Sequence, residues 1–283
     1  MSVLRRFLAA LAIATVPGAH AVAADLMPAP YIGGAPEVVP VEIGSGWYIR
    51  GDVGYAVKTN SPDFSYRTYD SGTDTYSSVG YDPSSSIDAN FSYGAGIGYH
   101  FNQFFRMDAT IERTNGKFGG TSSSTAPCSF TGEAGTGCDT QDSASFAGWS
   151  ALVNAYVEPG TFMGFTPYVG AGAGMTRLNW GDLTSAQYCT DGGNTCAAPG
   201  YVGTVTHGGQ GDWRFTWAVM AGLAYDLTPH LQLDLGYRYR HIAGGAMYGW
   251  DSSSALAGAT GVQASDKGLS THEVRVGLRY SIW

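Results

Sequence analysis

Residues 230–242 read HLQLDLGYRYRHI, and their side chains fall into two alternating sets. The first set is apolar and comprises Leu231, Leu233, Leu235, Tyr237 and Tyr239. The second set is polar or small and comprises Gln232, Asp234, Gly236, Arg238 and Arg240. Because successive side chains of a β-strand point to opposite faces, this segment predicts a strand with one apolar face and one charged face.

The same division recurs in other segments and indicates which face meets lipid. In 104–115, the residues Phe105, Met107, Ala109 and Ile111 alternate with Arg106, Asp108, Thr110 and Glu112. In 213–227, the apolar face is Phe215, Trp217, Val219, Ala221, Leu223 and Tyr225. A small barrel has room inside for few such bulky side chains, so we expect the apolar faces to contact lipid and the charges to line the lumen.

Eight segments have this strand period, and they are joined by connections of alternating length. The segments are 46–57, 88–101, 104–115, 146–157, 166–178, 213–227, 230–242 and 271–283. The long connections are 58–87, 116–145, 179–212 and 243–270, and the short ones are 102–103, 158–165 and 228–229. The pattern predicts an all-β fold, an eight-stranded antiparallel transmembrane β-barrel with four long extracellular loops and short periplasmic turns.

The final stretch, VRVGLRYSIW from Val274 to Trp283, has no turn or tail after it. A closed barrel explains this ending, because its last strand pairs with its first and leaves no free edge. We expect a lipid-facing set of Val274, Val276, Leu278, Tyr280 and Ile282. The lumen-facing set would be Glu273, Arg275, Gly277, Arg279 and Ser281.

The inward faces carry nearly balanced charges, which predicts a closed, ion-paired lumen. The expected cations are Arg50, Arg106, Arg214, Arg238, Arg240, Arg275 and Arg279. The expected anions are Asp52, Asp108, Glu112, Glu158, Asp226, Asp234 and Glu273. The core of this network is predicted over the last two strands, in a register that puts Arg240 opposite Glu273 and Asp234 opposite Arg279.

Aromatic residues gather near the strand ends, as expected for side chains at the two membrane interfaces. Trp47, Phe101, Phe105 and Tyr225 are predicted at the short-turn rim. Phe91, Trp149, Trp180, Trp213 and Trp217 are predicted at the long-loop rim. Alternate glycines, by contrast, are expected inside, where they leave space for larger neighbours: Gly94, Gly96, Gly98, Gly170, Gly172 and Gly174.

The N-terminal residues predict export from the cytoplasm. Residues 1–23 contain a basic start with Arg5 and Arg6, an apolar stretch and small residues before the expected cleavage site, as in a secretory signal peptide. Residues 24–45 are proline-rich and predict an extended periplasmic linker, and residues 46–283 predict the barrel. No stretch approaches the ~20 apolar residues of a spanning helix.

The chain has four cysteines, which allow three pairings. Two intraloop disulfides, Cys128–Cys138 and Cys189–Cys196, are predicted because each pair lies within one polar segment, and an oxidising compartment permits both bonds. A metal site made of all four cysteines is the alternative, although no pair has the short spacing of a zinc site.

Four stretches resemble a known family: GWYIRGDVGY (46–55), TPYVGAGAG (166–174), LTPHLQLDLGYRYR (227–240) and HEVRVGLRY (272–280). They are similar to the small eight-stranded outer-membrane barrels of alphaproteobacteria, a surface-antigen group related to opacity-type, porin-like barrels. The resemblance implies location in the cell outer membrane, contact with lipid and lipopolysaccharide, and insertion by the barrel assembly machinery. It also implies that an aromatic terminus, here Trp283, serves as an assembly signal.

Two histidines and a short polar motif are the candidates for chemistry. His241 and His272 flank the last long loop, and they could bind a metal or haem iron or simply contact water at the rim. The motif from Ser270 to Glu273 contains the residue types of a Ser–His–Glu hydrolase, but His272 and Glu273 are consecutive and so face opposite sides of a strand. We therefore predict no catalytic, cofactor-binding or metal residues and no enzyme activity.

The net charge of −8 disfavours nucleic acid as a partner. The predicted function is an integral outer-membrane barrel with a structural or surface-exposed role and a closed polar lumen. The alternatives are a haem receptor or an adhesin that binds a host surface through the long loops, and then a lipid-modifying enzyme.

Overall fold

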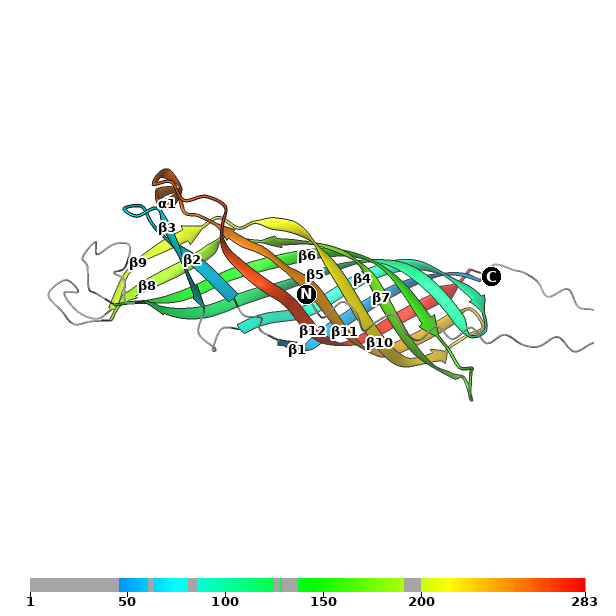
Figure 1. Ribbon diagram of the computed structural model, residues 1–283. Helices are drawn as coiled ribbons and strands as arrows, with labels where there is room; N and C mark the ends of the chain where they lie inside the picture. Colours follow the sequence, from blue (N-terminus) through cyan, green and yellow to red (C-terminus); the bar gives the residue numbers. More distant parts are fainter. Residues whose placement is uncertain are drawn as a thin grey trace, which may run out of the picture. The chain divides into compact units, whose positions relative to one another are not determined.

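The computed structural model describes residues 46–60, 64–80, 86–124, 128, 137–190 and 200–282. Eight long antiparallel strands form a closed ring in chain order, and β12 pairs with β1 to close it (Figure 1). They are β1 (Trp47–Asn60), β4 (Ser86–Asn102), β5 (Phe105–Ser124), β6 (Cys138–Val157), β7 (Phe165–Trp180), β10 (Gly211–Asp226), β11 (Leu231–Gly249) and β12 (Val262–Ser281). The predicted eight-stranded barrel is confirmed.

Five shorter elements lie in the long connections. They are β2 (Phe64–Asp70), β3 (Thr75–Gly80), β8 (Leu183–Cys189), β9 (Gly200–His207) and the helix α1 (Ser252–Leu256). The hairpin β2–β3 pairs with β12, and the hairpin β8–β9 pairs with β6. Strand β12 ends at the opposite end of the barrel, with the short turns (Figure 1). Within the described ranges, no helix is long and apolar enough to cross a bilayer.

The barrel strands are longer than predicted at the long-loop end. Residues 116–124 and 138–145 were expected in a loop but extend β5 and β6, and these two strands pair without interruption as far as Ser124 and Cys138. Likewise, β11 and β12 take up much of the connection predicted over 243–270. The predicted signal peptide, linker and terminal Trp283 lie outside the described residues and stay predictions.

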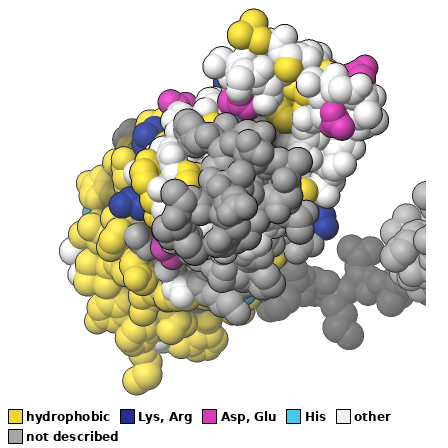
Figure 2. All heavy atoms as spheres, turned by 90° about the vertical axis from the view of Figure 1, so that its left-hand side faces the viewer, with side chains coloured by type: hydrophobic (Ala, Val, Ile, Leu, Met, Phe, Trp, Pro, Cys, Tyr) yellow, Lys and Arg dark blue, Asp and Glu magenta, His cyan; other side chains and the backbone are white. Residues whose placement is uncertain are grey.

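The outer wall is apolar, as the alternation predicted. On β12, the exposed fractions of Val274, Val276 and Leu278 are 43%, 49% and 49%. Viewed from the long-loop end, hydrophobic side chains cover the visible side of the wall, whereas the projecting part has only a few hydrophobic and acidic side chains (Figure 2). Exposed aromatic residues occur at the rims as predicted, including Trp47, Phe101, Tyr225, Phe91, Trp149, Trp213 and Trp217.

Trp180 is an exception, and its predicted place in the outer aromatic girdle is wrong. It is only 4% exposed and lies inside the barrel. The reason is parity: β7 continues to Trp180, which is an even number of residues from the inward-facing Gly174 and therefore points to the same side.

The interior has two regions with different contents. Toward the short-turn end it holds arginines and carboxylates, which we call the lumen network and describe below. Toward the long-loop end it holds an apolar group, here called the upper cluster. Its members are Phe64, Ile87, Phe118, Ala144, Phe146, Leu178, Trp180, Leu183, Ile242, Met247, Tyr248, Ala264 and Leu269.

The inward face of β12 changes parity where the two regions meet. Glu273 and Thr271 are buried at odd positions, whereas Asp266 and Ala264 are buried at even positions. Gly268 lies between these pairs with a φ of +118°, a conformation that residues with a side chain rarely adopt. The strict two-residue alternation therefore breaks here, and the sequence pattern ends at the same place.

Candidate functional site

The lumen network contains six arginines and six carboxylates, contributed by β1, β5, β11, β12 and the residue after β6. The arginines are Arg50, Arg106, Arg238, Arg240, Arg275 and Arg279. The carboxylates are Asp52, Asp108, Glu112, Glu158, Asp234 and Glu273. Each inward position follows from the alternation of its strand, which points every second side chain into the barrel.

The centre of the network crosses the lumen. Arg238 on β11 contacts Glu112 on β5 at 2.7 Å and Glu273 on β12 at 2.5 Å. In the ring of strands, three strands separate β5 from β11 in either direction, so the contact between Glu112 and Arg238 joins opposite walls. Both side chains are 1% exposed. Two further arginines share these carboxylates: Arg240 contacts Glu273 at 2.9 Å, and Arg275 contacts Glu112 at 2.8 Å.

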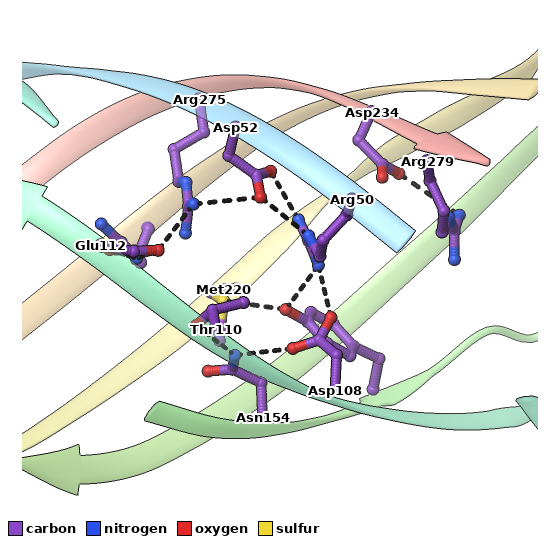
Figure 3. A network of polar contacts seen from close by, with 12 residues as sticks. Arg50, Asp52, Asp108, Thr110, Glu112, Asn154, Met220, Asp234, Arg275 and Arg279 are labelled. Carbon is purple, nitrogen blue, oxygen red and sulfur yellow. Dashed lines mark hydrogen bonds and ion pairs between the residues drawn. The ribbon is translucent and has the colours of Figure 1, made fainter. Parts of the chain in front are cut away.

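A chain of contacts continues from Arg275 toward the short-turn end (Figure 3). Asp52 lies between Arg275, at 3.5 Å, and Arg50, at 2.6 Å. Arg50 also contacts Asp108 at 2.6 Å. Asn154 on β6 donates a hydrogen bond to the second oxygen of Asp108 at 2.7 Å. The contacts therefore link β12, β1, β5 and β6 through the inside of the barrel.

A second crossing lies near the short turns. Glu158 accepts hydrogen bonds from Arg106 at 2.6 Å and from Arg279 at 3.2 Å. Arg279 also contacts Asp234 at 3.3 Å. The guanidinium carbon of Arg106 lies 3.7 Å from the centre of the Tyr156 ring, in cation–π geometry. The fully buried Arg106 thus has both a carboxylate and an aromatic partner.

The predicted register of β11 and β12 is wrong by two residues. Arg238 lies opposite Glu273, and Asp234 lies opposite Gly277, rather than the predicted Arg240 and Arg279. The predicted ion pairs Arg240–Glu273 and Asp234–Arg279 nevertheless form, as diagonal contacts. Since a long loop joins these strands, no tight turn fixed their register in the sequence, and a two-residue shift keeps every side chain on the same face.

Almost no open space is left among these side chains. A lumen cavity bordered by Arg50, Tyr156 and Arg275 has a volume of about 10 Å³, roughly that of one water. Glycines allow the close packing, because a Cβ atom on Gly96 would lie 3.3 Å from Arg50 Cγ, and one on Gly170 would lie 2.5 Å from the Tyr156 ring. Of the predicted inward glycines, Gly96 therefore faces an arginine, and Gly98 and Gly170 face tyrosine rings.

The structure adds a separate ion pair group above the lumen network. Arg214 contacts Asp266 at 2.6 Å and Asp212 at 2.7 Å. Arg214 was predicted to point inward, but Asp212 and Asp266 were missed because they fell in predicted loops. Asp226, predicted as a lumen anion, is half-buried near a short turn, where it accepts a hydrogen bond from Gln232 at 2.6 Å.

The candidate chemical residues are not assembled into a site. His272 Nδ1 lies 2.5 Å from the Tyr237 hydroxyl, and His241 Nδ1 lies 2.9 Å from the Ser270 hydroxyl. Glu273 points into the lumen toward Arg238, away from the face that carries His272 and Ser270. Ser270, His272 and Glu273 therefore form no hydrolase triad.

One of the two predicted disulfides is described. Cys128 and Cys138 are joined, with their Cα atoms 5.1 Å apart, which excludes the alternative of a metal site formed by all four cysteines. Cys189 is also disulfide-bonded and lies opposite Cys138 across β6 and β8. Its predicted partner Cys196 lies outside the described residues, so the second pairing stays a prediction.

A closed antiparallel ring with an apolar outer wall and an ion-paired interior defines a transmembrane β-barrel. The sequence matches the family described as outer membrane protein beta-barrel domain over residues 7–281. The chain belongs to this family and is an outer-membrane protein.

The chain is similar to proteins of other bacteria. An uncharacterized protein of Brucella suis biovar 1 is 35% identical over 266 residues, which cover 86% of this chain and 87% of the relative. An uncharacterized protein of Brucella abortus strain 2308 is 34% identical over 268 residues, which cover 86% of this chain and 87% of that relative. Among solved structures, Neisserial surface protein A (NspA) has 18% identity and a TM-score of 0.42, covering 84% of this chain and 98% of that one. The outer membrane protein OprG of Pseudomonas aeruginosa has 15% identity and a TM-score of 0.43, and the match covers 83% of this chain and 95% of OprG.

Proposed function

We propose that this protein is a structural, surface-exposed barrel of the outer membrane whose lumen is closed to solutes. The observation that supports this function is the contact between Glu112 and Arg238 across the lumen, together with the ion pairs around it. A diffusing solute would have to separate charges that are paired and buried, which is costly at low dielectric. The barrel then serves to anchor the long loops at the cell surface.

Liposome swelling tests the closed lumen. We expect liposomes that contain the purified, refolded protein to swell in isosmotic small sugars or amino acids no faster than protein-free liposomes. Liposomes that contain a general porin serve as the positive control. Swelling at a rate that falls with solute size would show a diffusion pore and overturn the proposal.

The alternative roles use the long loops. A haem receptor or a host-surface adhesin would fit the same barrel, and haem binding is tested by titration of the refolded protein with a Soret readout. A lipid-modifying enzyme is the weakest alternative, because the triad residues Ser270, His272 and Glu273 have other partners. Lipopolysaccharide and the barrel assembly machinery are proposed partners of the outer wall.

A further inference from the structure

A cavity of about 680 Å³ lies at the long-loop end of the barrel, separate from the lumen network. Its walls come from β2, β5, β6, β8, β9, β11, β12 and the start of α1, which gather at this end of the barrel (Figure 1). Leu183, Tyr248 and Ala264 line the cavity and also belong to the upper cluster. The cavity therefore rests on an apolar floor, and its volume is in the range of small-molecule sites.

The lining is rich in uncharged hydrogen-bonding groups. Among the described residues of the lining, ten are serines or threonines, and none is a lysine or an arginine. Burial lowers the pKa of His207, so this lining imidazole adds no positive charge at neutral pH. A lining without cations is a poor site for phosphate, sulfate or other anions.

Part of this lining is already ordered. The Ser122 and Thr140 hydroxyls are 2.8 Å apart, and Thr140 donates to Asp142 at 3.2 Å. The side chain of Asp251 accepts hydrogen bonds from the backbone and hydroxyl groups of Ser253 and Ser254. Burial alone would raise the pKa of Asp251, but these bonds outweigh it and lower the pKa to about 2. The Asp251 carboxylate is therefore ionised, and its hydrogen-bonding capacity is largely used by these four donors.

Tyr248 contributes a buried hydroxyl to this lining. The side chain is fully buried, and its hydroxyl makes no hydrogen bond with any of the described residues. A buried hydroxyl without a hydrogen-bond partner costs free energy, and a ligand that shifts the side chains covering the Tyr248 hydroxyl would supply that partner. The ring is also held in place, with its centroid 5.7 Å from that of Trp180.

Aromatic rings border the same cavity, and their arrangement narrows the class of ligand. Tyr69 and Trp250 line it and pack edge to face, with centroids 6.3 Å apart. The guanidinium of Arg67 already lies 5.6 Å from the Trp250 ring centre and 4.8 Å from that of Tyr76. Since Arg67 already lies over the Trp250 ring, an aromatic cage for a ligand ammonium group at that ring is disfavoured.

From these observations we infer that the cavity binds an uncharged carbohydrate, with Tyr248 as a hydrogen-bonding residue at its floor. Hydroxyl, amide and carboxylate groups of the lining match the hydroxyls of a sugar. The sugar belongs either to a soluble saccharide or to a surface glycan. This inference goes beyond the closed lumen and holds whether or not the barrel conducts.

The test uses the full chain, refolded without lipopolysaccharide in an amine-oxide detergent, because sugar-headed detergents would compete. Saturation-transfer NMR and a glycan array are run with neutral saccharides, with sucrose octasulfate as the anionic probe and with choline as the cationic probe. We expect a neutral saccharide to bind and Tyr248→Phe to weaken it by about tenfold, the effect of losing one hydrogen bond. Competition by purified lipopolysaccharide would identify a surface glycan as the source of the sugar. If lipopolysaccharide does not compete, the source is a soluble saccharide.

Two controls separate binding from folding. Tyr248→Phe removes a hydroxyl that has no partner, so its unfolding midpoint in urea should equal or exceed that of the wild type. Tyr93→Phe changes an exposed tyrosine on the outer wall and should leave binding unchanged. Three results would each overturn the inference. They are no binding of a neutral saccharide, tighter binding of the sulfated sugar or of choline, and equal saccharide affinity of Tyr248→Phe and the wild type.

Discussion

The two halves of the barrel interior are built from different chemistry on the same strands. On β5, Arg106, Asp108 and Glu112 join the lumen network, whereas Phe118, farther along the strand, joins the upper cluster. The lower half is filled with directional ion pairs, and the upper half is filled with packed apolar side chains. The comparison shows that a lumen can be filled in two ways, which should respond differently to mutation.

The largest expected effect comes from removing the central anion. Glu112→Ala leaves Arg238 and Arg275 without their shared carboxylate, and we expect a loss of ~3–5 kcal/mol in unfolding free energy. Urea unfolding in detergent micelles measures it. Glu112→Gln keeps the volume but removes the charge, so a loss as large as that of the alanine variant would show that charge, rather than packing, dominates. A loss below that of an exposed substitution such as Val276→Ala would contradict the ion-pair account of the lower half.

In the upper half, Leu178→Ala is the comparable change. Leu178 is 1% exposed within the upper cluster, and its truncation should cost about 2.7–5.0 kcal/mol through lost burial and a residual cavity. Leu178→Met, which conserves volume, should cost less than ~1.5 kcal/mol. If the methionine variant were as unstable as the alanine variant, the upper half would not be held by packing.

Sequence reasoning succeeded in the lower half for a physical reason. There the inward residues are charged and the outward residues are apolar, so the residue type alone assigns Arg238 to the lumen face and Leu235 to the lipid face. In the upper half, both sides are apolar or small, so the inward Trp180 looks like the outward Trp149 and was assigned to the lipid face. The parity change near Gly268 further removed the alternation that would have revealed Asp266 as an inward residue.

Other features depend on contacts that a single sequence does not contain. The predicted register of β11 against β12 was wrong because a long loop joins the two strands. The predicted ion pairs Arg240–Glu273 and Asp234–Arg279 still form, as diagonal contacts. The cavity beneath α1 could not be foreseen, since its walls come from elements that only the folded barrel brings together. No local pattern marks Tyr248 as a buried hydroxyl without a partner.

A smaller effect is expected from the disulfide at the long-loop end. Closing the loop between Cys128 and Cys138 should contribute ~2.5–3 kcal/mol in the chain-entropy description. Reduction should lower the unfolding midpoint without preventing barrel assembly, which gel mobility before and after heating reports. Non-reducing peptide mapping should recover Cys128 with Cys138, and a cross-link between Cys128 and Cys189 would contradict the assignment.

The smallest expected effect is the difference in unfolding free energy between alanine substitutions at an inward and at an outward glycine on two paired strands. A Cβ atom on Gly98 would collide with the Tyr48 ring, so Gly98→Ala should cost ~1–3 kcal/mol by overpacking. Gly51 on β1 has nothing within 4 Å of such an atom, and Gly51→Ala is the matched control, expected to be close to neutral. Equal unfolding curves for the two variants would mean that the lower lumen has more free space than the structure shows.

Single-channel recording in planar bilayers tests the closed lumen most directly. The purified wild type should give no steady conductance steps, because the contact of Arg238 with Glu112 and Glu273 blocks the lumen. Large, stable conductance steps from the wild-type protein would contradict the account and identify it as an open porin.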